Sequence, residues 1–562
     1  MTMLKAVLSA SPTHAMSCFE LPVSLCKRIQ STLTRFWWDG NDNKKKMCMT
    51  SWAKLSKPKK LGVLGFRDIQ LFNKALLAKQ SWRVLTNPDC LLSRVLRGKY
   101  CHNASFLTVK AQASCSHGWR GILHGRDLLA PNIGKAIGDG MCTRVWKDAW
   151  IRTDTLSCPM GPANEEVIDL FVSDLLLRGS GEWNKPKIRQ LLPGYAETIL
   201  CMRPSRLGAE DKWVWTLNNS GAYSTKSGYY EAVKQQNQEG EQHGIIQGNQ
   251  QNRLHNFNWN KHIWSVKTAP KIQVFLWKII QDALPLGMAL QRRGILSHPV
   301  TCARCGAPES ADHLFLHCRF ARQVWDNIPL TRTIDIGTNS TFDQCLAASH
   351  DLVCLPPTGV SGNIFSWVCW CIWTARNLLV FEDRTLDAKD ISCTSIKLAR
   401  EWQEAQAHKP LPAHNLGGNN SHIRELTSMT VSTLFTDAAW KAQDRTAGCG
   451  WIIHNPQERE TTSGTSTELC VASPLMAEAL AVREALLHAK ALHLSNICLK
   501  SDNQVLVKAL NSKQHPVELY GINLDIENLS SSFCSISFVH VSRNLNSAAD
   551  ALAKSAMYYL NP

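Results

Sequence analysis

Four acidic side chains in the last quarter of the chain stand where predicted strands end or predicted helices begin. They are Asp437, Glu478, Asp502 and Asp550. A lone buried carboxylate is unfavourable unless it is paired, hydrogen-bonded or bound to a metal, and Asp437 closes an apolar run. Mg²⁺ takes oxygen ligands, and two such ions about 3.5–4 Å apart can activate water and stabilise the leaving oxygen of an in-line displacement. Each acid alone is ordinary for a strand end or a surface helix. Together they predict a phosphodiesterase site that holds two Mg²⁺ or Mn²⁺ ions.

Local patterns predict the elements that position the first two acids. The apolar run that ends at Asp437 is followed by a second, glycine-broken run, which is typical of two successive strands. Ser473 is a suitable N-cap, and Pro474 follows it at the first helical position. The alanine- and leucine-rich helix that starts there carries Glu478 in its first turns.

The other two acids fall in a similar arrangement further along the chain. Ile497 and Leu499 alternate inward in a predicted strand, and Asp502 lies at its C-terminal end. A later strand and loop lead into a helix capped near Asn546 or the serine after it, with Asp550 in the opening turn. The predicted order is therefore strand, helix, strand end and helix start.

A second group of residues has the spacing of a zinc ligand set. The pattern Cys-x2-Cys-x7-His-x4-Cys comprises Cys302, Cys305, His313 and Cys318. A structural zinc site uses four thiolate or imidazole ligands at tetrahedral corners, and a Cys-x2-Cys turn supplies two of them. His317 is a rival ligand, but it directly precedes Cys318, and adjacent side chains point apart. Free buried thiols are the alternative. We expect one structural Zn²⁺ ion that stabilises the fold and takes no part in chemistry.

The positive charge is concentrated in the first three quarters of the chain. The formal net charge is +16, whereas residues 430–562 hold 10 Lys and Arg against 12 Asp and Glu, a net charge of −2. Residues 1–429 therefore carry a net charge of +18. This distribution predicts contact between the body and a polyanion such as nucleic acid. A basic surface that is merely solvated is the alternative.

Composition limits the class of protein. Hydrophobic residues make up 44% and charged residues 19% of the chain, which excludes a wholly disordered protein. The N-terminus lacks the apolar core of a signal peptide, and no stretch reaches the roughly 18 apolar residues of a membrane span. The 21 cysteines are expected to be mostly reduced thiols. We expect an intracellular protein, nuclear or cytoplasmic, without membrane contact, and the oligomeric state stays open.

The chain is long enough for three or four domains. Two polar stretches, Lys234–Asn252 and Ala407–His422, are predicted linkers that divide it into three blocks. In the first block, Ile69, Phe72 and Leu76 recur at helical spacing.

Five segments of the last block follow one another between residues 431 and 560: "TDAAW", "GCGWII", "MAEALAVREAL", "LKSDNQVLVKAL" and "VSRNLNSAADALAK". Together they resemble the RNase H domain of plant non-LTR (LINE-type) retrotransposons. The resemblance implies a mixed five-stranded sheet flanked by helices and hydrolysis of the RNA strand of an RNA–DNA hybrid. The four acids match the metal-binding acids of this family.

The segment before the last helix matches a further pattern of the family, His-x5-Asn-x3-Asp, through His540, Asn546 and Asp550. The resemblance implies that His540 shuttles protons or helps product leave. The alternative is a strand-end histidine with a satisfied hydrogen bond. Asn503 and Arg543 are expected to contact 2′-hydroxyls of one strand, and Asn546 is also assigned to nucleic-acid binding.

The resemblance extends upstream. Residues from about Tyr223 to Trp325, with "APKIQVFLWK" and the cysteine cluster, resemble the zinc-binding domain that follows reverse transcriptase in these elements. The segments "RFWWDG", "LGVLGFRDIQLFNKALLAKQSWRVL" and "RVLRGKY" resemble the stretch just after the polymerase core. The chain contains no Asp-Asp dipeptide, so the paired aspartates of a polymerase site are absent and no DNA synthesis is expected.

The predicted architecture is multidomain, with mainly helical basic N-terminal and zinc-binding regions followed by an α/β RNase H-like domain. The predicted domains are a post-polymerase region (1–150), a zinc-binding domain (222–330), a helical connection (331–406), a linker (407–430) and the RNase H-like domain (431–562). The leading hypothesis is an endonuclease acting on RNA–DNA hybrids or structured RNA. The alternatives are a catalytically silent nucleic-acid-binding relic and a zinc-dependent protein-interaction scaffold.

Overall fold

The computed structural model describes residues 2–39, 47–56, 59, 62–102, 104–152, 156–161, 165–177, 179–242, 257–295, 300–332, 337, 340–407, 431–456, 460–514 and 516–558. The chain forms two compact units. Unit I comprises residues 1–13, 21–72 and 237–421, and unit II comprises residues 14–20, 73–236 and 422–562. Residues 243–252 of the first predicted linker and 408–422 of the second lie outside the described residues.

Unit I is helical. Its described helices are α2 (Val23–Asp39), α3 (Trp52–Leu55), the first turn of α4 (Ile69–Thr86), α11 (Pro270–Ile280), α12 (Gly287–Arg292), α13 (Arg319–Asp326), α14 (Phe342–Ala348), α15 (Phe365–Glu382) and α16 (Ala388–Ala407), with short π-helices at Leu4–Leu8, Asn260–Trp264 and His313–His317. Pro270 occupies the first position of α11, where a backbone N–H has no acceptor within the helix. Proline therefore costs no hydrogen bond there and favours the start of the helix. The apolar stripe of α11 is buried, at Ile272, Phe275 and Leu276 among others.

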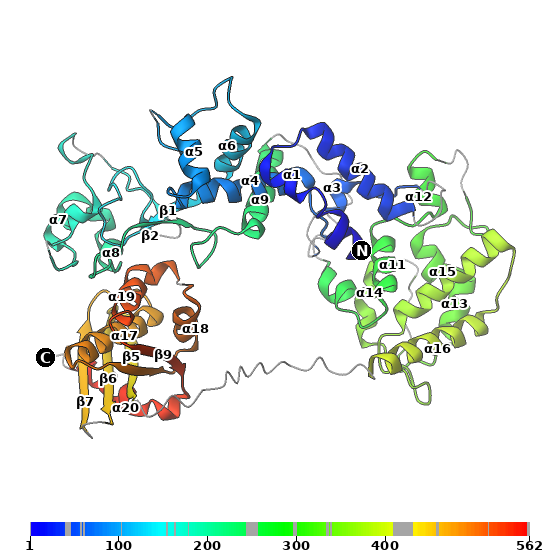
Figure 1. The fold of residues 1–562 in the computed structure, drawn as a ribbon. Helices are drawn as coiled ribbons and strands as arrows, with labels where there is room; N and C mark the ends of the chain where they lie inside the picture. Colours follow the sequence, from blue (N-terminus) through cyan, green and yellow to red (C-terminus); the bar gives the residue numbers. More distant parts are fainter. Residues whose placement is uncertain are drawn as a thin grey trace. The chain divides into compact units, whose positions relative to one another are not determined.

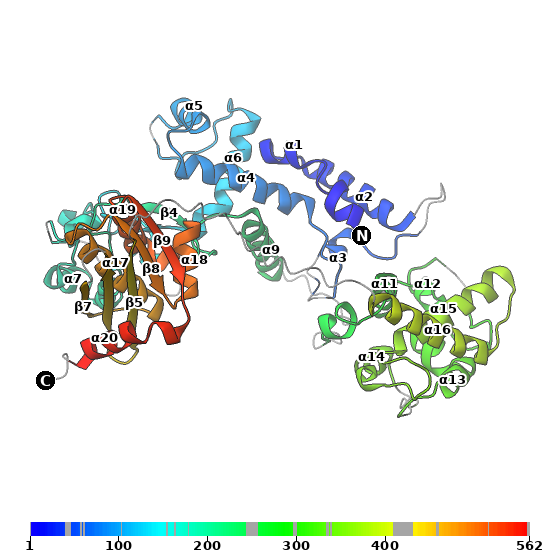
Figure 2. The same ribbon diagram turned by 60° about the horizontal axis from the view of Figure 1, so that its bottom comes forward.

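The helices from α11 to α16 pack as one bundle (Figure 2). The buried Ser392 hydroxyl of α16 donates to the Val324 carbonyl of α13 at 2.9 Å. Glu309, only 2% exposed, accepts two hydrogen bonds of 2.8 Å from Arg376 of α15. The bundle therefore continues across residue 330, where the predicted zinc-binding domain and helical connection meet.

The first half of unit II comprises residues 14–20 and 73–236. Its elements are most of α1 (Thr13–Cys18) and α4, then α5 (Leu91–Tyr100), α6 (His117–Leu129), β1 (Ile133–Ala136), β2 (Ile151–Arg152), β3 (Leu156–Ser157), α7 (Lys185–Leu191), α8 (Ala196–Leu200), β4 (Lys212–Trp215) and α9 (Thr225–Gln242). The strands form two antiparallel pairs, β1 with β4 and β2 with β3. A separate core lies between residues 137 and 200, around the buried Trp150 and Ile199.

The second half of unit II is a mixed five-stranded sheet with helices on both faces (Figure 1). The strands are β5 (Ser432–Lys441), β6 (Thr446–Asn455), β7 (Glu460–Glu468), β8 (Asn496–Ser501) and β9 (Ser535–His540), and the helices are α17 (Pro474–Ala491), α18 (Gln504–Ser512), α19 (Tyr520–Ser530) and α20 (Ser547–Tyr558). The strand order is β7-β6-β5-β8-β9, antiparallel across β7, β6 and β5 and parallel across β5, β8 and β9. The predicted fold class is thus confirmed.

Alternate residues of β6 face the helices on opposite sides of the sheet. The Cys449 thiol donates to the Ala477 carbonyl of α17 at 3.8 Å, so it faces α17. A Cβ on Gly450 would lie 2.5 Å from the Ala553 nitrogen of α20, which no side chain permits. Gly450 therefore lets α20 approach the sheet directly.

A loop at residues 203–210 joins the two halves of unit II. The Asp525 carboxylate of α19 is fully buried. It accepts hydrogen bonds from the Ser205 hydroxyl at 2.5 Å, the Arg206 nitrogen at 3.0 Å and the Leu207 nitrogen at 3.1 Å. The Tyr520 hydroxyl donates to the Glu210 carbonyl at 2.8 Å. The sheet and residues 130–221 therefore share a bonded interface that the sequence patterns did not predict.

Among the described helices, none combines the length and apolar character that crossing a lipid bilayer requires.

Candidate metal centres

Asp437 lies in the middle of β5, opposite Gly450 of β6. Directly opposed residues of an antiparallel pair point to the same face, so Asp437 faces the side of the sheet that α20 approaches. Its side chain is 5% exposed, and one carboxylate oxygen accepts the Ala438 N–H at 2.8 Å. Burial and the neighbouring Asp502 charge raise the pKa of Asp437 to about 6.

Glu478 and Asp502 are brought to Asp437 by two different elements. Glu478 lies in the second turn of α17, which begins as predicted: the Ser473 hydroxyl accepts the Met476 N–H at 3.1 Å. Asp502 directly follows β8, a strand that pairs in parallel with β5. One oxygen from each of the three carboxylates lies within 4.8 Å of the other two. The structure thus assembles three of the four predicted acids.

The three clustered carboxylates are suited to bind a cation. Burial, followed by the charges of Asp437 and Asp502, raises the pKa of Glu478 to about 9. One Glu478 oxygen is buried and has no hydrogen-bond partner among the described residues. A buried acceptor without a donor is costly, and a hard divalent cation would satisfy it. The donor set, all carboxylate oxygens, fits Mg²⁺ or Mn²⁺.

Asp550 lies in the first turn of α20 and is outside this group of three. Its charge contributes to the raised pKa of Asp437, which indicates proximity. One Asp550 oxygen accepts from the Lys554 ammonium, one helical turn later, at 2.6 Å. The structure therefore places Asp550 beside the cluster with its carboxylate partly occupied by a lysine.

His540 and Arg543 lie at the rim of the cluster. The exposed His540 ends β9, and its Nε2 lies 3.1 Å from the Asp502 carbonyl oxygen. The Arg543 side chain is 85% exposed, and its Nε lies 3.8 Å from the Asp502 carboxylate. Both side chains are accessible from solvent next to the acids.

Asn503 and Asn546 make structural hydrogen bonds in this conformation. The Asn503 side chain caps α18 by accepting the Leu506 N–H at 3.0 Å. Asn546 is 1% exposed, and its amide donates to the Thr436 carbonyl of β5 at 2.9 Å. Asn546 thus fixes the start of α20 against β5. The contacts of both residues with nucleic acid stay predictions.

The four predicted zinc ligands lie together at one end of α13. Zn–S bonds of about 2.3 Å place two sulfurs at tetrahedral corners about 3.8 Å apart. The Cys302–Cys318 and Cys305–Cys318 sulfur distances are both 3.9 Å, and Cys305 Sγ lies 3.1 Å from His313 Nε2. All four ligand atoms lie within 4.8 Å of one another. The geometry and the donor types fit one zinc ion.

The hydrogen bond between Cys302 and Cys318 makes the two thiols unequal. It lowers the pKa of the Cys318 thiol to about 7, which makes a thiolate accessible at neutral pH, and it raises the pKa of the Cys302 thiol to about 12. The rival ligand His317 is engaged elsewhere, because its Nε2 lies 2.9 Å from the Ser340 carbonyl oxygen.

Two arginines near the zinc cluster were missed by sequence reasoning. The Arg304 guanidinium lies 3.4 Å from the centre of the Phe320 ring and, by its charge, interacts with Cys302 and Cys318. Arg376 holds Glu309, which lies between the two halves of the ligand set, through the paired 2.8 Å hydrogen bonds. The position of Arg304 inside the Cys-x2-Cys turn was a usable signal, but Arg376 lies 58 positions after Cys318 and carries none.

Two parts of the chain match known protein families. Residues 435–556 match the family described as reverse transcriptase-like, and residues 223–325 match the family described as zinc-binding in reverse transcriptase. The first match spans the sheet and its acids, and the second ends within α13, after the zinc ligands.

Two relatives come from Arabidopsis thaliana. An "Uncharacterized mitochondrial protein" is 46% identical over 156 residues, which is 28% of this chain and 99% of the relative. A "Putative ribonuclease H protein" is 27% identical over 582 residues, covering 99% of this chain and 88% of the relative.

Solved structures of RNase H1 proteins are also similar to a part of this chain. RNase H1 from Halobacterium salinarum is 26% identical, with a TM-score of 0.22, and covers 23% of this chain and 98% of its own. LC11-RNase H1 in complex with an RNA/DNA hybrid is 18% identical, with the same TM-score, and covers 23% of this chain and 99% of its own.

Proposed function

Because the chain belongs to the plant retroelement-derived proteins with a reverse-transcriptase-type zinc-binding region and an RNase H-like domain, we propose that it is a metal-dependent endonuclease that cleaves the RNA strand of RNA–DNA hybrids. The observation that carries the proposal is the convergence of Asp437, Glu478 and Asp502 within 4.8 Å. Three carboxylates this close repel one another unless protons or cations join them. A stable ionised cluster therefore implies a divalent cation.

The proposed roles of the acids follow from their positions. Asp437, Glu478 and Asp502 would hold two Mg²⁺ or Mn²⁺ ions, and Asp550 would complete the set once Lys554 releases it. The bound ions would supply an activated water and a counter-charge for the departing oxygen. Water oxygen then bonds to phosphorus as the bond to the leaving sugar oxygen breaks.

Two rim residues are proposed to handle the substrate. His540 is exposed beside Asp502 and would accept or pass a proton during attack or product release. Arg543 is 85% exposed at the same rim, so its guanidinium group would be free to contact 2′-hydroxyls of one strand of the hybrid. Asn503 and Asn546 are proposed to support this surface, although their side chains also make the structural bonds described above.

We further propose that one Zn²⁺ ion stabilises unit I through Cys302, Cys305, His313 and Cys318. A site with four protein ligands has no open position for substrate, so its role is structural. The net charge of +18 on residues 1–429 supports nucleic-acid binding by the body. The proposal also includes an intracellular location, nuclear or cytoplasmic, and the five predicted domains, of which the zinc-binding domain and the helical connection pack as one bundle.

The test uses the full-length chain and an RNA–DNA hybrid labelled on the RNA strand. With Mg²⁺ or Mn²⁺, the native protein should cleave the RNA, and Asp437→Asn should not. Asp444→Asn is a matched control, because Asp444 lies in the turn after the same strand, is about half exposed and, among the described residues, forms an ion pair with Lys441 alone. Its cleavage rate should equal that of the native protein.

Two outcomes would replace the proposal. A native protein that binds the hybrid but leaves it as intact as Asp437→Asn does would be a silent nucleic-acid-binding relic. A protein that neither binds nor cleaves the hybrid at low salt would favour the zinc-dependent protein-interaction scaffold, because phosphate contacts are strongest at low ionic strength.

A further inference from the structure

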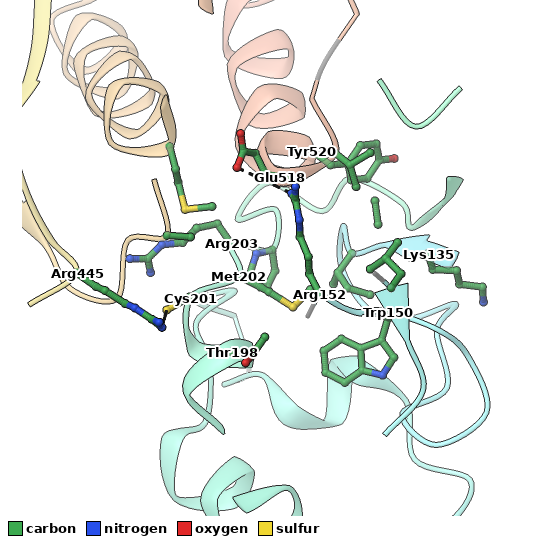
Figure 3. Close-up of a pocket in the computed structure, with 18 residues that line it drawn as sticks. Lys135, Trp150, Arg152, Thr198, Cys201, Met202, Arg203, Arg445, Glu518 and Tyr520 are labelled. Carbon is green, nitrogen blue, oxygen red and sulfur yellow. Dashed lines mark hydrogen bonds and ion pairs between the residues drawn. The ribbon is translucent and has the colours of Figure 1, made fainter. Parts of the chain in front are cut away.

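A cavity of about 360 Å³ lies inside unit II, between residues 130–221 and the five-stranded sheet. Figure 3 shows its lining, which comes from β2 and α8 on one side and from the β5–β6 turn, α17 and the turn before α19 on the other. Ligand pockets usually measure about 300–1,000 Å³, so the cavity suits a small ligand. Nothing in the carboxylate site or the zinc site accounts for it.

Cationic groups dominate the polar part of this cavity. Its described lining contains Lys135, Arg152, Arg203 and Arg445 but only one acid, Glu518. Lys135 pairs with Asp148 outside the lining at 3.0 Å. Arg203 pairs with Glu468 at 3.3 Å, whereas Arg152 is half exposed and 3.9 Å from Glu518. The weakly held guanidinium groups are therefore those of Arg152 and Arg445.

Arg445 is the least neutralised of these cations. Among the described residues, no carboxylate oxygen lies within 4.0 Å of its guanidinium group, and its hydrogen bond goes to the Cys201 sulfur at 3.3 Å. Its backbone has a φ of 49°, in the left-handed region that non-glycine residues seldom adopt. Figure 3 shows the Arg445 side chain extending from the β5–β6 turn toward Cys201 at the cavity.

Most of the other described lining residues are apolar. The buried side chains of Trp150 and Met476 contribute to it, together with the half-buried Met202 and Leu156. Methionine is flexible and polarisable, so it adapts to planar ligands. A cavity that combines guanidinium groups with apolar side chains suits an anion that carries a flat organic group.

The cavity is separate from the carboxylate cluster. Its described lining includes none of the four acids. Met476 lines the cavity and Glu478 faces the cluster, and residues two apart on a helix point about 200° apart, because each residue turns the helix by about 100°. Helix α17 thus stands between the two sites, so each can be tested without the other.

We propose that this cavity binds a single nucleotide, with the phosphate held at one end by Arg445, beside Cys201, or at the other by Arg152, beside Glu518, and the nucleoside against Met202 and the apolar side chains. The nucleotide is either free in solution or the phosphorylated end of a nucleic-acid strand. Guanidinium groups match phosphate oxygens in both cases.

The test measures binding to the full-length protein by calorimetry, without added Mg²⁺ and in the Asp437→Asn background, which removes the carboxylate site. The probes are adenosine 5′-monophosphate, adenosine, inorganic phosphate, and a trinucleotide with and without a 5′-phosphate. We expect saturable binding of the monophosphate at one site per chain. Adenosine and inorganic phosphate should each bind at least tenfold more weakly, because adenosine lacks the phosphate that an arginine would bind and inorganic phosphate lacks the nucleoside that the apolar side chains would contact.

Two variants and one control locate the site. Whichever of Arg445→Met and Arg152→Met removes the phosphate ligand should weaken binding of the monophosphate at least tenfold while the melting temperature stays the same, since Arg445 is exposed and the Arg152 side chain is half exposed. Arg94→Met, on the exposed face of α5, should bind as the parent does. If the phosphorylated trinucleotide binds more tightly than the monophosphate, the ligand is a strand end; if not, it is a free nucleotide.

Three results would overturn the proposal. These are the absence of saturable binding by any phosphorylated probe, equal binding of adenosine and its monophosphate, and binding that both arginine variants leave unchanged. Loss of hybrid cleavage would not affect it, because the carboxylate cluster is disabled in this assay.

Discussion

Replacement of Ser205 by alanine should destabilise the five-stranded sheet, although Ser205 precedes its partner Asp525 by 320 positions. The Ser205 hydroxyl donates to the buried Asp525 carboxylate and also accepts the Leu207 and Ala209 N–H groups at 3.2 and 3.1 Å. The substitution therefore removes a charge-assisted hydrogen bond and loosens the loop that supplies two others.

The expected loss can be derived from the remaining contacts. A hydrogen bond to a charged group contributes about 1.5–3 kcal/mol. Asp525 would keep the Arg206 and Leu207 N–H groups and Arg483 at 3.5 Å, so we expect a loss of about 2 kcal/mol, or about 30-fold in the opening equilibrium. Asp525→Ala should lose more than Ser205→Ala, because it removes the acceptor of all three loop hydrogen bonds, while the 2% exposed Arg483 would keep its ion pair with Glu484 at 3.1 Å.

Hydrogen exchange of the full-length protein, followed by mass spectrometry, measures this effect element by element. Amides of α19 should exchange about 30-fold faster in Ser205→Ala, while α11 in unit I should be unchanged. Ser180→Ala serves as the control, since Ser180 is an exposed serine in the same half of unit II. Equal exchange of α19 in Ser205→Ala and Ser180→Ala would show that the loop at 203–210 does not stabilise the sheet.

Two further predictions concern the metal centres. Cys305→Ser should lower the zinc content, measured by elemental analysis, from about one ion per chain to none, and it should lower the melting temperature. The control Cys393→Ser replaces an exposed cysteine of α16 and should keep the zinc. Zinc retained by Cys305→Ser would contradict the ligand assignment. Mg²⁺ should raise the melting temperature more at pH 9 than at pH 6, because Glu478, with a pKa of about 9, is protonated at the lower pH and competes with the ion. Without metal, the stability of the fold should fall as the pH rises. The pKa of Glu478 in the folded state lies above its ordinary value of 4.5, so the contribution of Glu478 to stability is complete below pH 4.5 and is lost as the pH rises through 9. A Mg²⁺ effect that is independent of pH, or equal in Glu478→Gln, would contradict this reasoning.

Local signals sufficed for much of the fold and the sites. The Ser473 cap and Pro474 predicted the start of α17, and the inward alternation of Ile497 and Leu499 predicted β8. The Cys-x2-Cys turn predicted two of the zinc ligands. These features depend on neighbours within a few residues, so the sequence alone carries them.

Long-range pairings could not be predicted in this way. The bond between Ser205 and Asp525 joins two polar residues that are each unremarkable in their own segment. The half of unit II between residues 130 and 221 uses strands of only two to four residues, which are too short for a periodic pattern. The ion pair between Asp550 and Lys554 is local and could have been predicted, since residues four apart on a helix commonly form ion pairs.

The separation of Ser205 and Asp525 in the chain also sets a delay during protein synthesis. Ribosomes add about 5–20 residues per second, so roughly 16–64 s pass between the two residues. For that interval the Ser205 hydroxyl and the Arg206 and Leu207 N–H groups lack their Asp525 acceptor. The interface between residues 130–221 and the sheet can therefore close only after residue 525 has been added, and a chain truncated before it would lack these hydrogen bonds.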